Sequence, residues 1–341
     1  MIQFQCDYEE GACPQILERL MATNLEQTVG YSEDEYCKQA REKIKKACDA
    51  PEADVHFLVG GTQTNYVVIR SILRPYQGVI SAVTGHINVH ETGAVEATGH
   101  KVLALPSKDG KITASQVRAY YDAHWNDADH EHIVQPGMVY ISYPTENGTI
   151  YSKSELQELY ATCKELGLPL FMDGARMGYG LMSEKSDMTL ADIAANTDVF
   201  YIGGTKVGAL FGEAVVITKS ALKKDFRYCM KQSGAMLAKG RLLGIQFDTL
   251  FTDDLYFKIA AHADKLAMKL KNAILEKGYK MYFDSYTNQQ YPILSKKDRE
   301  KLAQKYQFSF WEQIDEDYAA VRFCTSWATS EEAIDELIQD I

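Results

Sequence analysis

Two apolar segments constrain the fold more than any other part of the sequence. The first, Leu-Pro-Leu-Phe-Met at residues 168–172, carries no charge and ends at Asp173. The second, Val-Phe-Tyr-Ile at residues 199–202, is followed by Gly-Gly-Thr-Lys and so leads to Lys206. Short uncharged runs of this kind are typical of strands buried in a parallel sheet. Because such sheets bind ligands at the carboxyl ends of their strands, we expect an α/β fold in which Asp173 and Lys206 face one crevice.

A carboxylate and a lysine that face one crevice suit pyridoxal phosphate chemistry. The lysine amine forms a Schiff base with the cofactor, and the carboxylate keeps the pyridine nitrogen protonated so that the ring accepts electrons. Taken singly, Asp173 is more readily interpreted as a helix cap and Lys206 as a surface lysine. Their occurrence together, with the glycine-rich segment described next, favours the cofactor interpretation.

Gly60, Gly61 and Thr62 follow the apolar segment at residues 56–59 and precede a helix predicted at residues 65–73. Glycines let a phosphate approach the backbone closely, and the N–H groups and dipole at the start of a helix favour an anion. An ordinary turn between a strand and a helix has the same composition. With a lysine available downstream, we predict that this turn binds the phosphate of the cofactor.

Three motifs resemble those of low-specificity threonine aldolases. They are Gly-Gly-Thr-Gln-Thr-Asn at residues 60–65, Asp-Gly-Ala-Arg at 173–176 and Gly-Gly-Thr-Lys at 203–206. The resemblance covers residues 31–245 and returns at residues 321–327, with the motifs in the order typical of that family. It implies a β-eliminating lyase of the fold-type I group, dependent on pyridoxal 5'-phosphate.

The resemblance also implies an architecture and an assembly. A large cofactor-binding domain with a mainly parallel sheet is expected at residues 25–250, and a smaller α+β domain at residues 251–341. Residues 1–24 are expected to pack at a subunit interface. Relatives are homo-oligomers, and a dimer or a homotetramer with active sites at the subunit interface is implied. Lys231 or Lys239 would then reach the neighbouring phosphate, although a solvated charged face is the alternative.

Several residues match functional positions of the family. His86 matches a histidine that stacks on the cofactor ring, for which a flat imidazole that also carries a proton is well suited. Glu91 matches a position near the ring and the substrate. Tyr31 matches a tyrosine near the cofactor of the partner subunit. Arg322, on an apolar strand where a charge must be paired, matches an arginine that binds the substrate carboxylate.

Arg176, three residues after Asp173, is close enough to the expected ring to grip a substrate carboxylate with its planar fork. A structural salt bridge is the alternative for this residue. The predicted site therefore contains the catalytic residues Lys206, His86 and Asp173; the cofactor-binding residues Gly60, Gly61, Thr62, His86, Asp173, Arg176, Thr205 and Lys206; and the substrate-binding residues Arg176, Arg322, Glu91 and Tyr31.

Two departures from the family pattern affect the expected chemistry. The serine of its amino-terminal motif is here Cys6. The segment Tyr-Pro-Thr-Glu at residues 143–146 replaces one in which relatives carry a second histidine, a candidate base for the β-hydroxyl group of the substrate. Cleavage then needs another base, and the candidates are His86, Glu146 and a phosphate-bound water. Alternatively, the substrate is not the one that the family uses.

Composition narrows the class of protein. The formal net charge of -11 argues against nucleic acid or an anionic membrane as a partner. No apolar run reaches the length of a membrane span, and no signal peptide follows the first methionine, so a cytoplasmic protein is expected. The 7 cysteines are scattered singly, which indicates reduced thiols. The histidine-rich residues 124–132 are expected on a polar loop that binds no metal.

The remaining pattern gives a coarse map. A helix that continues to Cys48 is expected to follow a glycine turn, with Ser32 as its N-cap on the structural interpretation. Helices are further predicted at residues 14–22, 113–123, 154–166 and 254–277, and strands at residues 78–83, 101–105, 138–143, 209–217, 280–283, 308–311 and 321–325.

The predicted function is cleavage of the Cα–Cβ bond of a β-hydroxy-α-amino acid, threonine or allo-threonine, to glycine and acetaldehyde. The same residues would also serve a β-eliminating lyase acting on another amino acid. A non-catalytic nucleotide-binding α/β protein is the alternative from another class, and it leaves Asp173 and Lys206 without a purpose.

Overall fold

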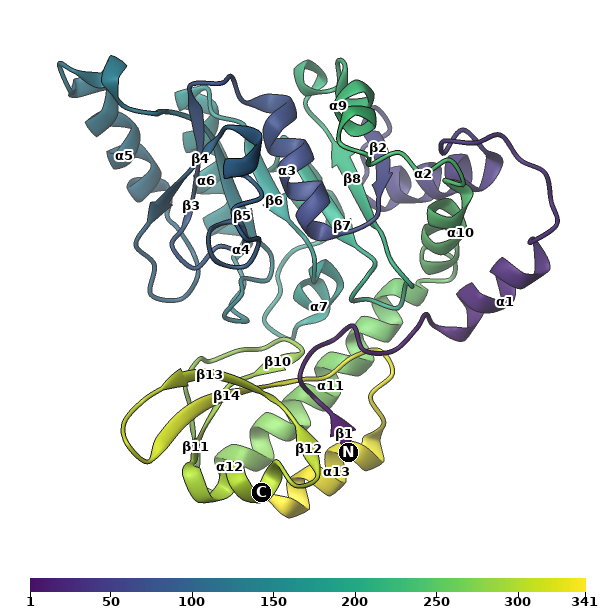
Figure 1. Cartoon of the computed structure of the whole chain (residues 1–341), viewed down its shortest axis with the longest axis vertical. Coiled ribbons are helices and arrows are strands. Elements are labelled where there is room, and N and C mark those ends of the chain that lie inside the picture. Colours follow the sequence, from purple (N-terminus) through teal and green to yellow (C-terminus); the bar gives the residue numbers. More distant parts are fainter.

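A seven-stranded sheet forms the centre of the chain in a computed structural model that describes residues 1–341 (Figure 1). Its strand order is β2-β8-β7-β6-β5-β3-β4. Every neighbouring pair is parallel except those that involve β8, which runs antiparallel to β2 and β7. The strands are β2 (Asp54–Leu58), β3 (Gln77–Ala82), β4 (Lys101–Leu105), β5 (Gln135–Ser142), β6 (Leu170–Asp173), β7 (Val199–Gly203) and β8 (Glu213–Ile217). The expected α/β fold with a mainly parallel sheet is confirmed.

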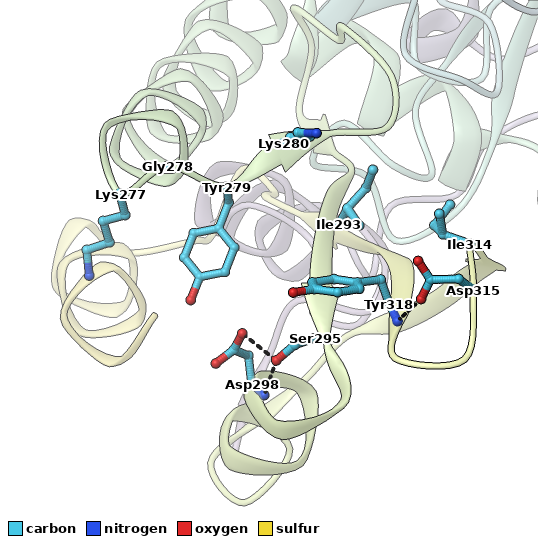
Figure 2. A pocket seen from close by; sticks show the side chains of 10 residues that line it. All are labelled: Lys277, Gly278, Tyr279, Lys280, Ile293, Ser295, Asp298, Ile314, Asp315 and Tyr318. Carbon is cyan, nitrogen blue, oxygen red and sulfur yellow. Dashed lines mark hydrogen bonds between the residues drawn. The ribbon is translucent and has the colours of Figure 1, made fainter.

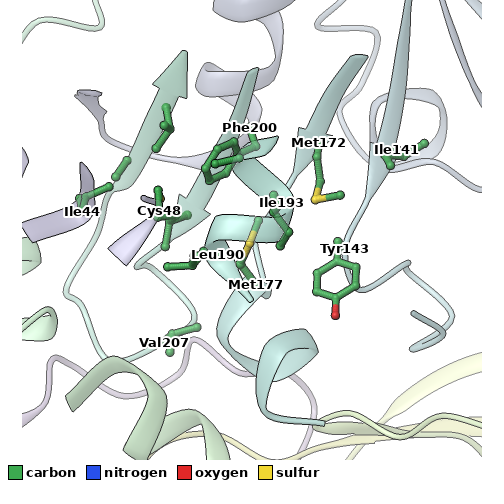
Figure 3. Close-up of a cluster of buried hydrophobic side chains, with 14 of the residues drawn as sticks. Ile44, Cys48, Ile141, Tyr143, Met172, Met177, Leu190, Ile193, Phe200 and Val207 are labelled. Carbon is green, nitrogen blue, oxygen red and sulfur yellow. The ribbon is translucent and has the colours of Figure 1, made fainter. Parts of the chain in front are cut away.

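Helices cover both faces of this sheet, which explains why its strands are apolar throughout. Alternate residues of each strand enter two separate clusters of buried side chains, since side chains point to opposite faces in turn. The larger cluster includes Met172 and Phe200 from the sheet and Ile44 and Ile193 from the helices that cover it (Figure 3). The helices of the two layers are α2 (Glu35–Ala47), α5 (Ala114–Asn126), α6 (Lys153–Leu166), α8 (Leu190–Ala195) and α10 (Arg241–Leu250) on the side of the larger cluster, and α3 (Gly61–Ile72) and α9 (Phe226–Gln232) on the other.

A smaller lobe follows helix α11 (Leu255–Glu276). This helix runs from the edge of the sheet layer into the smaller lobe (Figure 1). Its antiparallel strands have the order β10-β14-β11-β9, and β13 pairs with β14. The amino-terminal β1 (Ile2–Gln3) pairs in parallel with β12 (Tyr306–Gln307) of this lobe. The other elements of the lobe are β9 (Lys280–Met281), β10 (Gln289–Gln290), β11 (Pro292–Ser295), α12 (Lys296–Leu302), β13 (Ser309–Gln313), β14 (Tyr318–Cys324) and α13 (Glu331–Asp340). None of the helices is both long and apolar enough to cross a membrane.

Three local expectations were wrong. Asp34, not Ser32, caps α2, because its Oδ1 accepts the backbone N–H of Cys37 at 2.9 Å while Ser32 has a positive φ of 65°. The strand expected from residue 209 begins only at Glu213. Residues 204–212 instead form the loop that joins β7 to β8. His124 lies at the end of α5 rather than on a polar loop, and it is buried beside Trp125.

Candidate active site

A cavity of about 270 Å³ lies at the carboxyl ends of β5, β6 and β7. Most of the predicted site residues meet in its wall. The lining residues predicted from the sequence are Gly61, Thr62, His86, Asp173, Arg176, Thr205 and Lys206. Segments far apart in the sequence thus meet where the strand ends converge, as expected for a parallel sheet.

Asp173, the last residue of β6, is buried and accepts four hydrogen bonds. The hydroxyl of Tyr140 and the amide of Asn65 donate to Oδ2 at 2.6 and 2.9 Å. The hydroxyl of Tyr201 and the backbone N–H of Ala175 donate to Oδ1 at 2.5 and 2.9 Å. Burial alone would raise the pKa of Asp173, but the charge of His86 and the two tyrosine hydrogen bonds hold it below its ordinary value. Asp173 is therefore a persistent negative charge inside the protein.

Lys206 lies in the loop between β7 and β8. The turn is closed by backbone hydrogen bonds from Gly204 and Thr205 to Gly212, and Tyr179 donates its hydroxyl to the Lys206 carbonyl at 2.6 Å. Burial, and then the charge of Arg176, lowers the pKa of the Lys206 amine. A lowered pKa leaves more of the amine neutral and nucleophilic at neutral pH.

Glu213, the first residue of β8, lines the same cavity. It accepts hydrogen bonds from the hydroxyl of Thr205 at 2.8 Å and from the backbone N–H of Gly204 at 3.2 Å. Burial raises the pKa of this carboxyl group, and the charge of Lys206 offsets part of that effect. Thr205 is thus held by the strand that follows the lysine loop.

The predicted phosphate turn forms the start of α3. Gly60 is its N-cap residue, and Gly61 and Thr62 occupy its first turn and line the cavity. The first N–H groups of a helix have no partner within the helix and therefore suit an anion. A Cβ at Gly61 would lie 3.2 Å from the hydroxyl of Tyr201, so glycine keeps this corner of the cavity open.

His86 begins the short helix α4 (His86–Val89) and lines the cavity. Its Nδ1 lies 2.8 Å from Oε1 of Glu91, and the same carboxylate oxygen accepts a hydrogen bond from Asn65 at 2.7 Å. Asn65 therefore links the orientation of His86 to that of Asp173. Glu91 itself is buried and does not line the cavity, so the structure places it behind His86.

Arg176 is paired with Asp7, which comes from the extended amino-terminal segment. The guanidinium donates to both carboxylate oxygens, from Nε at 2.7 Å and from Nη2 at 2.9 Å. Asp7 is buried, and the charges of Arg176 and Lys206 outweigh its burial, so that its pKa is lowered. The structural salt bridge that was the alternative for Arg176 is present, and Arg176 also lines the cavity.

A second cavity, of about 530 Å³, adjoins the first and reaches the smaller lobe. Arg322 of β14 lines it, donating to the side chain of Gln289 at 3.1 Å and to the carbonyl of Gln5 at 2.9 Å. The Nε atom of Arg322 is buried and has no hydrogen-bond partner. No carboxylate neutralises this guanidinium, which makes it suited to an anionic ligand.

Tyr31 is the predicted site residue that stands apart. It is 44% exposed, lines neither cavity, and lies under the amine of Lys231, which is 4.4 Å from its ring centre. Lys239 borders a different cavity, beside residues 23–30. Tyr31 therefore lies on the surface together with Lys231, one of the two lysines expected to reach a neighbouring subunit.

A larger cavity of about 630 Å³ lies in the smaller lobe, away from these residues (Figure 2). Tyr279 and Tyr318 line it together with Asp298 and Ser295, whose side chains are hydrogen-bonded to each other at 2.7 Å. None of the residues predicted to be functional contributes to it. Size alone therefore does not identify the active site of this chain.

Comparisons with known proteins agree with this geometry. Residues 3–297 match the family model of β-eliminating lyases. The chain belongs to the β-eliminating lyase family. Low-specificity L-threonine aldolases from a Pseudomonas strain and from Pseudomonas aeruginosa are 32% and 31% identical to it, each over 99% of this chain and 96% of the relative. The solved structure of a Leishmania major threonine aldolase is 44% identical with a TM-score of 0.97, covering 99% of this chain and 98% of the other.

More distant structures share the fold alone. An aspartate aminotransferase variant from Thermus thermophilus is 14% identical and has a TM-score of 0.72. The comparisons confirm that this β-eliminating lyase is a fold-type I enzyme dependent on pyridoxal 5'-phosphate.

The residues present in the lyase fit that cofactor. A buried carboxylate and a half-buried lysine, each with a lowered pKa, line one cavity together with the start of a helix. The carboxylate suits the ring nitrogen of pyridoxal 5'-phosphate, the lysine suits its aldehyde, and the start of the helix suits its phosphate.

The sequence analysis missed several residues of this site. Tyr140 and Tyr201 stand out only as hydroxyl-bearing residues on otherwise apolar strands. Asp7 lies in a segment that could not be placed from local pattern, since its contact with Arg176 spans 169 positions. Asn65 was part of a recognised motif, but its two carboxylate partners are far apart in the sequence.

Proposed function

We propose that this lyase cleaves the Cα–Cβ bond of a β-hydroxy-α-amino acid, converting threonine or allo-threonine to glycine and acetaldehyde. The observation that carries the proposal is that Asp173 and Lys206 face one cavity, adjoined by a second cavity with an unneutralised arginine. The threonine aldolases found among its relatives support the same reaction.

Pyridoxal 5'-phosphate, when bound, accepts the electron pair that remains on Cα when the bond breaks. In this proposal Lys206 is the residue that would hold the cofactor. Asp173 keeps the ring nitrogen protonated, and its four hydrogen bonds prevent it from taking that proton itself. Gly60, Gly61 and Thr62 would hold the phosphate, and Thr205 would contact the cofactor beside Lys206.

Arg322 and Arg176 bind the substrate carboxylate in the proposal. Arg322 has no carboxylate partner and one unpaired nitrogen, and both arginines line the second cavity, where Asp7 holds the guanidinium of Arg176. A carboxylate fixed at two points restricts rotation of the substrate, so that the bond to be broken can be aligned with the ring. His86, held by Glu91, is the residue proposed to cover the ring face.

The proposed assembly is a homo-oligomer, a dimer or tetramer, in which Tyr31 and Lys231 serve the site of the partner subunit. Exposed apolar side chains in the segment that precedes Tyr31 in the chain support an interface along that segment. They include Leu17, Met21, Leu25 and Val29, with exposures of 43%, 80%, 92% and 66%. We further propose a large domain at residues 25–250, a small domain at 251–341 and an interface segment at 1–24. A cytoplasmic location is proposed from the 7 free cysteines.

The test compares purified wild type with Lys206→Ala in the presence of added cofactor. Wild type is expected to show a visible absorption band and to release glycine and acetaldehyde in equal amounts from L-threonine or L-allo-threonine. Lys206→Ala is expected to lack the band and the products. A band in wild type without these products would overturn threonine cleavage, and a band unaffected by the substitution would overturn the role of Lys206.

Lys297→Ala, at an exposed position on α12 that does not line the cavity, is a matched control for loss of a lysine. It is expected to retain the visible band of the wild type.

A further inference from the structure

Glu146 is one of the candidate bases that the sequence left open, and one of its carboxylate oxygens is buried without a partner. Oε1 accepts the hydroxyl of Ser142 at 2.6 Å and the backbone N–H of His86 at 3.0 Å. Oε2 is inaccessible and accepts no hydrogen bond. An unsatisfied buried carboxylate oxygen is costly, so such an atom indicates that a donor is supplied by something else.

The position of Glu146 relates it to both cavities. Only five residues line the cavity at the strand ends and also the cavity that reaches Arg322: Tyr8, His86, Glu146, Arg176 and Lys206. A substrate with its amine near Lys206 and its carboxylate near Arg322 must pass this junction. Glu146 is the only carboxylic acid there.

The turn that carries Glu146 is held from several sides. Tyr291 of the smaller lobe donates its hydroxyl to the carbonyl of Glu146 at 2.6 Å. Within the turn, the backbone N–H of Thr145 donates to the carbonyl of Thr149 at 2.9 Å. At Gly148, with φ of 75°, an added Cβ would lie 2.2 Å from the hydroxyl of Ser285. The carboxylate is therefore preorganised rather than carried on a loose loop.

The surroundings also favour proton acceptance by Glu146. Burial raises the pKa of its carboxyl group, the hydrogen bond from Ser142 lowers it, and the charge of Asp173 raises it further. A carboxylate of raised pKa accepts a proton more readily during a reaction near neutral pH. His86 has a different task in the proposed function, where it covers the ring face while Glu91 holds its Nδ1.

We propose that the carboxylate of Glu146 accepts the β-hydroxyl proton of the substrate during cleavage, in place of the second histidine that this chain lacks. The hydroxyl O–H bond breaks and its proton passes to Glu146. The Cβ–O bond becomes the carbonyl of the released aldehyde, and the electron pair of the broken Cα–Cβ bond remains on Cα. This assignment rests on the proposed aldol cleavage.

The test compares threonine cleavage with exchange of the Cα protons of glycine, a reaction that needs no β-hydroxyl base. Glu146→Gln keeps the shape and removes the proton acceptor. We expect its kcat for threonine cleavage to fall roughly 100- to 1,000-fold. Exchange of the Cα protons of glycine with deuterated solvent, followed by proton NMR, should stay within about threefold of wild type, because glycine has no β-hydroxyl. Glycine affinity, measured by calorimetry, should also be unchanged.

Two further variants make the result decisive. Glu146→Asp keeps a carboxylate that is one methylene shorter and should recover part of the cleavage lost in Glu146→Gln. Glu158→Gln, an exposed residue on α6, is the matched control and should behave as wild type in both assays.

Cleavage within about threefold of wild type in Glu146→Gln would overturn the assignment. An equal loss of cleavage, exchange and glycine affinity would also overturn it, because that result indicates a structural role. A wild-type protein that exchanges glycine protons but does not cleave threonine would instead refute the proposed function.

Discussion

At the scale of single residues, Asp173 shows how a carboxylate stays charged inside a protein. It accepts four hydrogen bonds from Tyr140, Tyr201, Asn65 and the backbone of Ala175. Two of the four come from side chains on neighbouring strands, β5 and β7. Hydrogen bonds to the charged form and a nearby positive charge lower the pKa of a carboxyl group, and here they outweigh its desolvation.

Asp173→Asn tests this arrangement. An amide cannot keep the ring nitrogen protonated, and its NH₂ group would face donors that now point at a carboxylate. We expect kcat for threonine cleavage to fall by about 100-fold or more, since a group that stabilises developing charge is lost. The measurement is steady-state release of acetaldehyde with saturating cofactor. Tyr201→Phe, which removes one donor and keeps the charge, should lose about tenfold; activity near wild type in Asp173→Asn would contradict the assigned role.

At the scale of helices and strands, much of the fold was predictable because local pattern and burial agree. The predicted helix at residues 14–22 and the predicted strand at residues 101–105 coincide with α1 (Pro14–Ala22) and β4. The start of β8 was placed too early because Ala209, Leu210 and Phe211 are apolar although they lie in the lysine loop. Their apolarity has another cause, since Ala209 is buried in the larger cluster and Phe211 packs against it.

Some residues of the candidate site could likewise be predicted from the sequence, and others could not. Residues that follow a strand or start a helix, such as Asp173 and Gly61, were identifiable from the sequence. Contacts made by side chains from distant segments, such as Asp7 with Arg176, depend on the finished fold and leave no local pattern.

The cap of α2 gives a test at this scale. Asp34→Ala removes the hydrogen bond to the backbone of Cys37 and is expected to lower the free energy of unfolding by about 1 kcal/mol. Ser32→Ala, the position favoured by the sequence pattern, should have almost no effect on stability through capping. Chemical denaturation of both variants at neutral pH gives the comparison. A larger loss in Ser32→Ala than in Asp34→Ala would contradict the cap seen here.

At the scale of the whole molecule, His56 makes stability depend on pH. Burial, together with the charges of Arg41 and Arg227, lowers the pKa of His56 to about 4, although Asp54 acts in the opposite direction. The unfolded chain then binds more protons than the folded one between this value and the ordinary pKa of about 6.5. Stability from this residue is therefore full above pH 6.5 and is lost as the pH falls toward 4.

His56→Phe should remove that dependence, because phenylalanine is neutral and can pack on Phe226, which now lies 4.9 Å from the imidazole ring. On going from pH 7 to pH 5, the wild type is expected to lose about 2 kcal/mol more unfolding free energy than the variant loses. Denaturant titrations at the two pH values measure it. A difference that does not change with pH would show that His56 is not kept neutral by folding.

The proposed assembly is testable by mixing inactive subunits. If Tyr31 serves the partner's site, a Lys206→Ala subunit and a Tyr31→Ala subunit form a hybrid dimer with one intact site. In that site, Lys206 comes from the Tyr31→Ala subunit and Tyr31 comes from the Lys206→Ala subunit. Random exchange in an equal mixture makes half of the dimers hybrids, so about a quarter of wild-type sites should be restored. Co-refolded mixtures are assayed for threonine cleavage against the separately refolded variants. Recovery no greater than their average would place Tyr31 in its own subunit's site or outside any site, because hybrid formation could then restore nothing.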